Sequence, residues 1–85
     1  MDMPENNSPL VLSDIHAGDH ATILAFEGGR AVVNRLASLG FTPGALVNMS
    51  QNYGRGPLIV TVRGTRVALG RGEAERIVVR QGSHD

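Results

Sequence analysis

Hydrophobic and polar residues alternate along several short segments of the chain, and this alternation predicts β-strands. A period of two places every second side chain on the same face of a strand. The clearest segment has Leu58, Val60 and Val62 on one face, and an earlier segment has Val47 and Met49 on its inner face. The predicted strands cover residues 20–26, 45–50, 58–63, 67–69 and 77–79.

One segment has a different spacing, which predicts a single amphipathic helix over residues 30–39. Val32, Leu36 and Leu39 recur at the three- and four-residue intervals that place side chains on one side of a helix. Gly40 follows directly, where a helix often ends in a left-handed residue without a Cβ. We therefore expect the helix to stop at Gly40.

Glycine and proline mark the turns between these elements. Residues 41–44 read Phe-Thr-Pro-Gly, which predicts a type II turn with Pro43 and Gly44 at its corners. Residues 64–65 separate two predicted strands, and a link of two residues that begins with glycine predicts a type II′ hairpin. Residues 73–75 are expected to form one helical turn.

The fold class predicted from this pattern is mainly β: a small SH3-like five-stranded barrel with one short α-helix between strands 1 and 2. Five short strands joined by tight turns would leave exposed edges unless the sheet curls and closes. An open sheet of three or four strands with the helix across one face is the alternative. We expect the domain to cover residues 10–80, with polar tails over 1–9 and 81–85.

Composition limits the classes of function open to the chain. A chain of 85 residues supplies one core, and the absence of cysteine excludes disulfides and thiolate metal sites. The formal net charge is zero, which gives no overall field to attract nucleic acid or anionic lipid. No apolar stretch approaches the roughly 20 residues of a membrane helix. We expect a cytoplasmic protein that does not insert into a membrane.

Candidate metal ligands are sparse. His16 and His20, with Asp14 and Asp19 near them, are weak candidates, because His16 lies in a predicted turn and His20 at the start of a strand. We therefore predict no dedicated metal site. The glycines at 28–29 and 54–56 lack the Lys-Ser/Thr ending of a phosphate loop and are interpreted as turns. We predict neither an enzyme nor a bound cofactor.

A nucleic-acid-binding barrel of the SH3 or OB type is the alternative function. Four arginines lie close together in the sequence, at positions 55, 63, 66 and 71. Single-stranded nucleic acid binds to such barrels mainly through aromatic stacking, however, and the chain has only two phenylalanines and one tyrosine. Protein recognition is therefore the preferred interpretation, and no nucleic acid is expected.

Residues 35–44, Arg-Leu-Ala-Ser-Leu-Gly-Phe-Thr-Pro-Gly, resemble the core of FeoA domains. The resemblance extends to residues 12–19, 56–57, 67–69, Gly64, Ala74 and Ile77, and Gly70 departs from the polar residue that the family more often has there. The resemblance implies a stand-alone cytoplasmic SH3-like protein that assists FeoB, the membrane GTPase that imports ferrous iron in many bacteria. It would lie at the inner membrane through FeoB.

A surface for a partner is predicted at the helix exit and the loop that follows the second strand. Its residues are Arg35, Leu39, Phe41, Tyr53 and Arg55, which would bind FeoB or another copy of the chain. The alternative for Leu39 and Phe41 is that these two side chains only close the end of the barrel.

Overall fold

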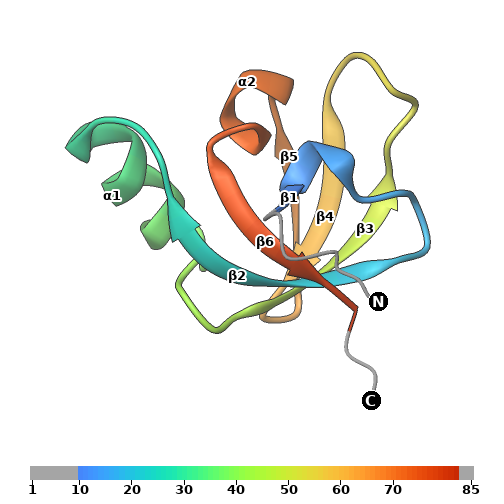
Figure 1. Ribbon diagram of the computed structural model, residues 1–85, viewed down its shortest axis with the longest axis horizontal. Coiled ribbons are helices and arrows are strands. Elements are labelled where there is room, and N and C mark those ends of the chain that lie inside the picture. Colours follow the sequence, from blue (N-terminus) through green and yellow to red (C-terminus); the bar gives the residue numbers. More distant parts are fainter. Residues whose placement is uncertain (1–9, 83–85) are drawn as a thin grey trace, which may run out of the picture.

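The structure is a computed structural model, and it describes residues 10–82 of the chain (Figure 1). Its elements are β1 (Leu10–Val11), the 3-10 helix η1 (Leu12–Asp14), β2 (His20–Phe26), α1 (Arg30–Ser38), β3 (Leu46–Gln51), β4 (Leu58–Val62), β5 (Thr65–Leu69), α2 (Arg71–Ala74) and β6 (Ile77–Gln81).

All six strands belong to one antiparallel sheet with the order β1-β6-β2-β3-β4-β5. The register shifts once between Ile23 and Ala25 on β2, and again between Met49 and Gln51 on β3. Such irregularities bend a strand and increase its twist. The sheet is strongly curved, as Figure 1 shows. The buried hydrophobic side chains form a single core.

The core consists of small aliphatic side chains and one aromatic ring. The strands contribute alternate residues, with Val47 and Met49 inward on β3 as predicted, and Leu58, Val60 and Val62 inward on β4. The buried hydrophobic residues form one cluster, and no buried polar or charged residue occurs among residues 10–82. Burial of apolar area is therefore the main source of stability.

The mainly β architecture is confirmed, but the sheet has six strands where five were predicted. The additional strand, β1, pairs Leu10 with Val79 and Val11 with Val78. A strand of two residues is too short to show any period, so the pattern could not reveal it. β6 also extends through Gln81, the first residue of the tail expected over 81–85. The expected tail over 1–9 and the last three residues of the other tail lie outside the described residues.

The exit of α1 is fixed by a Schellman motif, as the position of Gly40 suggested. Gly40 has a φ of 102° and donates its N–H to the carbonyl of Ala37, while Phe41 donates to the carbonyl of Leu36 over 3.0 Å. The side chains of Leu36 and Phe41 are both buried, which is the hydrophobic contact that accompanies this motif. The type II turn that follows is also confirmed: Gly44 has a φ of 90°, and the N–H of Ala45 donates to the carbonyl of Thr42.

The turn between β4 and β5 differs from the prediction by one residue. Val62 pairs with Thr65, so the two corner residues are Arg63 and Gly64 rather than residues 64–65. Their φ values are 50° and 79°, and two positive φ angles are the mark of a type I′ turn, not of type II′. The sequence pattern did not predict this turn position, because arginine is not a residue type that favours positive φ.

Candidate functional site

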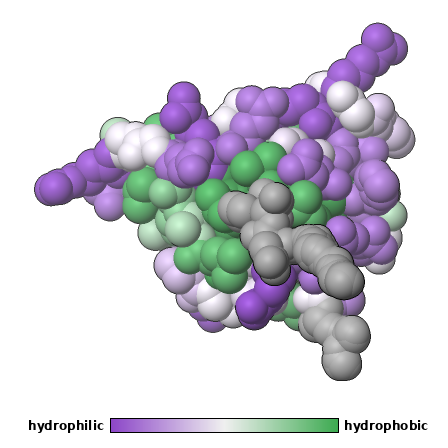
Figure 2. Space-filling model, viewed as in Figure 1, coloured by the Kyte–Doolittle hydropathy of each residue, from purple (hydrophilic) through white to green (hydrophobic). Residues whose placement is uncertain are grey.

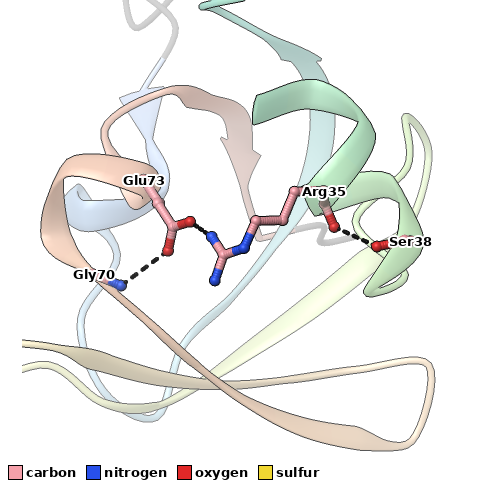
Figure 3. Close-up of polar contacts among 4 residues, drawn as sticks. All are labelled: Arg35, Ser38, Gly70 and Glu73. Atoms are coloured by element: carbon pink, nitrogen blue, oxygen red, sulfur yellow. Dashed lines mark hydrogen bonds and ion pairs between the residues drawn. The ribbon is translucent and has the colours of Figure 1, made fainter. Parts of the chain in front are cut away.

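The short helix α2 lies between the two segments in which binding residues were predicted. On one side, the guanidinium of Arg35 on α1 forms an ion pair with the carboxylate of Glu73 on α2 (Figure 3). The other carboxylate oxygen of Glu73 accepts the N–H of Gly70 over 3.3 Å at the start of α2. Glu73 therefore both caps its own helix and links that helix to Arg35 of α1.

On its other side, α2 is joined to the loop over residues 52–57. Arg71 donates from Nη2 to the Oδ1 of Asn52 over 2.6 Å. The same Oδ1 accepts the N–H of Gly54, and the Asn52 side-chain amide donates to the backbone carbonyls of Ser13 and Ile15 over 3.1 and 2.8 Å. One side chain thus fastens the base of this loop to α2 and to the η1 segment.

Tyr53 projects from this fastened loop. It is 79% exposed, the highest value among the large hydrophobic and aromatic residues described, and Arg55 beside it is also exposed. Gly54 and Gly56 have φ values of 86° and 74°, which glycine adopts without the strain that a Cβ would cause. An exposed aromatic ring on a loop with a fixed base loses little conformational entropy when it binds a partner.

Of the two residues predicted at the helix exit, only Leu39 is on the surface. Leu39 is 36% exposed. The assignment of Phe41 as a contact residue is wrong, because its side chain is completely buried in the core. The Schellman motif turns the chain so that the residue after Gly40 packs against Leu36, and Phe41 therefore closes the end of the barrel.

The structure does not bring Leu39 and Tyr53 into one patch. Leu39 precedes β3 and lies toward the turn between β4 and β5, where Arg63 donates to the carbonyl of Gly40 and to the hydroxyl of Thr42. Tyr53 follows the other end of β3. Six strand residues separate the two regions, which is about 20 Å. Arg35 is closer to the middle, since it reaches α2.

The two histidines named as weak metal candidates lie on either side of the turn that leads into β2. His16 is exposed, and its carbonyl accepts the N–H of Asp19 within the turn that leads into β2. His20 is half-buried at the start of β2, opposite Asn48. Within residues 10–82, no three side chains of His, Cys, Asp or Glu are placed to hold a metal ion.

Several arginines are engaged in contacts within the protein. Arg63 and Arg71 donate to neighbouring loops as described above, and Arg35 pairs with Glu73. Arg76 lies against Gly28, where a Cβ would meet its guanidinium at 3.0 Å. Of the four arginines that are close in the sequence, Arg63 and Arg71 therefore form internal hydrogen bonds, whereas Arg55 and Arg66 are exposed.

A second apolar surface was not singled out from the sequence. Leu24 on β2 and Leu46 on β3 are 42% and 50% exposed on the outer side of the sheet. Thr22 lies directly opposite Leu46, so Leu24 is its diagonal neighbour. Figure 2 shows apolar surface gathered over the middle of the face that carries β2 and β6. The alternation that predicted Val47 and Met49 inward already implied that Leu46 faces outward.

A shallow hollow of about 530 Å³ lies between α1 and α2. The residues that line it are Glu27, Val32, Gly72, Glu73, Glu75 and Arg76. Its charged groups have mixed sign, with three glutamates and one arginine.

Comparisons with known proteins agree with this architecture. Residues 10–81 match the family model described as the FeoA domain. A protein of Methanocaldococcus jannaschii described as "Putative Fe(2+) transport protein A" is 31% identical over 62 residues, which cover 73% of this chain and 74% of that protein.

Two solved structures are similar over most of the chain. A crystal structure described as the iron uptake regulatory protein FeoA has 35% identity and a TM-score of 0.83, and the match covers 88% of this chain and all of that one. FeoA of Stenotrophomonas maltophilia, solved with zinc and described as a prokaryotic SH3 domain protein, has 35% identity and a TM-score of 0.73 over 82% of this chain and 88% of its own. The SH3-like fold is thus confirmed.

Proposed function

This chain belongs to the FeoA family, and from that membership we propose that it is an accessory protein of ferrous iron uptake that binds and regulates the membrane GTPase FeoB. The description of the S. maltophilia relative suggests that it activates ferrous iron transport, and this supports the proposal. No helix among residues 10–82 is long and apolar enough to span a membrane. In this proposal the chain acts from the cytoplasmic side, by protein contact and without catalysis of its own.

The exposed ring of Tyr53 is the observation that carries the proposal for the contact surface. It is the only tyrosine of the chain, and it stands clear of the core on a loop that Asn52 fastens. Tyrosine and arginine are common among the residues that contribute most to protein interfaces. We assign Tyr53 and Arg55 to the centre of the FeoB contact.

Leu39 and Arg35 form the second part of the proposed surface. Arg35 is held beside α2 by Glu73, and Arg71 of the same helix holds the loop of Tyr53. A partner that covers α2 would therefore touch both regions at once. A contact of this breadth is within the size of ordinary protein interfaces.

The test is a binding measurement with full-length FeoB in lipid nanodiscs. The dissociation constant of the labelled chain is compared with those of Tyr53→Ala and Tyr53→Phe. We expect at least a tenfold loss for Tyr53→Ala, since truncation of a central aromatic anchor costs about 2 kcal/mol or more. Tyr53→Phe retains the ring and should retain most of the affinity.

Leu46→Ala is the matched control, because Leu46 is a large apolar side chain that is 50% exposed on the outer sheet face. It should leave FeoB binding unchanged. The proposal fails if the wild-type chain does not bind FeoB. The assignment of the surface fails if Tyr53→Ala binds as well as wild type, or if Leu46→Ala is the variant that loses affinity.

A further inference from the structure

The strand β5, which has five residues, forms one edge of the sheet. Among the described residues it pairs with β4 alone. The opposite edge is β1, which has only two residues. Proteins normally keep an edge strand short, cover it, or place charges on it, because its unpaired N–H and C=O groups can add another strand. On β5 the exposed side chains are Thr65, Arg66 and Ala68.

The type I′ turn determines which backbone groups of β5 point outward. A two-residue turn makes its flanking residues, Val62 and Thr65, a hydrogen-bonded pair. Hydrogen-bonded and non-bonded pairs alternate along an antiparallel ladder. Val67 and Leu69 therefore bond to β4, while the N–H and C=O groups of Arg66 and Ala68 point away from it.

This edge is complementary to itself in one register. If two copies of β5 lie antiparallel about a two-fold axis at Val67, Arg66 of each copy faces Ala68 of the other. The outward groups of these residues then form four hydrogen bonds across the axis. The register that would place Arg66 opposite Arg66 is disfavoured by the repulsion of like charges directly opposite one another.

The packing at Val67 agrees with this arrangement. Val67 is 9% exposed, the largest value among the buried core residues. In the paired register its side chain would meet the same side chain of the second copy, at a non-bonded position where side chains approach most closely. The core of each molecule would continue across the axis.

We infer that β5 is a homotypic docking edge, through which two copies of this chain join their sheets in the register that pairs Arg66 with Ala68. The interface is isologous, as two-fold dimers require. It is smaller than a standard interface, so the dimer is weak and reversible. The residues that it pairs are not among those proposed to contact FeoB.

The first test is the mass of the purified chain in sedimentation equilibrium as its concentration is raised. We expect the mass to rise from 9.0 kDa toward twice that value. A mass that stays at the monomer value up to about 1 mM, where even a contact of about 4 kcal/mol would be half-formed, would overturn the inference.

Two substitutions at the exposed Ala68 then test the register with opposite expected signs. Ala68→Glu places a carboxylate opposite Arg66 twice in each dimer, so the dissociation constant should fall about fivefold. Ala68→Arg places a second arginine opposite Arg66 and should raise the dissociation constant by a similar factor. Equal effects of the two variants, or none, would contradict the proposed pairing.

Amide hydrogen exchange gives an independent readout at single residues. The amides of Arg66 and Ala68 should become protected as the concentration rises, whereas that of Val67 is bonded to β4 at every concentration. Protection that appears elsewhere while residues 66 and 68 stay exchangeable would locate a dimer on another surface. These measurements contain no FeoB, so their failure leaves the proposed function untouched.

Discussion

Arg71 donates a hydrogen bond of 2.6 Å to the side-chain oxygen of Asn52, and this contact joins α2 to the loop that presents Tyr53. The two residues are 19 positions apart in the sequence. Asn52 also donates to carbonyls that precede it by 37 and 39 positions, so a single amide connects three distant segments.

Asn52→Ala should lower the free energy of unfolding by about 2 kcal/mol, because the part-buried side chain forms several hydrogen bonds at once and each contributes about 1 kcal/mol. Urea unfolding measures this change. Asn34→Ala on the exposed side of α1 is the matched control and should stay within about 0.5 kcal/mol. Equal stabilities of the two variants would show that the Asn52 contacts are not retained in solution.

Gly40→Ala and Gly72→Ala should change stability in opposite directions. Gly40 has a φ of 102°, where a Cβ is strained, so alanine should cost about 1 to 2 kcal/mol. Gly72 lies inside α2, its added Cβ would meet no atom within 4 Å, and alanine should stabilise by about 0.5 kcal/mol. Thermal unfolding measures the direction of both stability changes. A Gly40→Ala variant that is more stable than wild type would exclude the Schellman motif.

Phe41→Asp and Leu39→Asp separate the buried residue from the exposed one. A carboxylate at the completely buried position 41 would have no partner. The free energy of burying it exceeds the whole free energy of unfolding of a domain of this size. We expect Phe41→Asp to lose the native circular dichroism and Leu39→Asp to retain it. Only Leu39→Asp is therefore suitable for measuring FeoB binding, and a folded Phe41→Asp would contradict the buried position.

Glu73→Gln removes the ion pair with Arg35 but keeps an oxygen for the N–H of Gly70. The Arg35 side chain is 59% exposed and that of Glu73 is 27% exposed, so solvent screens the pair and the loss should be less than about 1 kcal/mol. The difference from wild type should disappear in 1 M NaCl, where the screening length is about 3 Å. Glu75→Gln, also exposed on the surface, controls for the change in net charge. A loss that is independent of salt would mean that Glu73 acts through packing instead.

Local patterns predicted most of the fold. Alternation placed Val47 and Met49 inward, and the Gly40 and Pro43-Gly44 signals fixed the exit of α1 and the turn after it. These features depend on neighbours in the sequence. The two-residue strand β1 has too few residues for a period, and the positive φ of Arg63 is contrary to its residue type.

The site was less accessible to sequence reasoning because its contacts are long-range. No sequence motif around Asn52 predicts its hydrogen bonds to Ser13, Ile15 and Arg71. Helical spacing indicated that Leu39 and Phe41 were both near the end of the helix, but only the reversal of the chain at Gly40 decides that one is exposed and the other buried. Tyr53 remains a prediction as a binding residue.

The position of β6 has a consequence for how the chain is made. Within residues 10–82, β6 is synthesised after the other five strands, yet it does not lie at an edge but between β1 and β2, with Ile77 and Val79 fully buried. Without β6, the other strands would form a sheet that lacks an inner strand and leaves the core open to solvent. The domain therefore cannot complete its fold before β6 is available to pair, and a nascent chain that stops at α2 would expose the apolar faces that β6 normally covers.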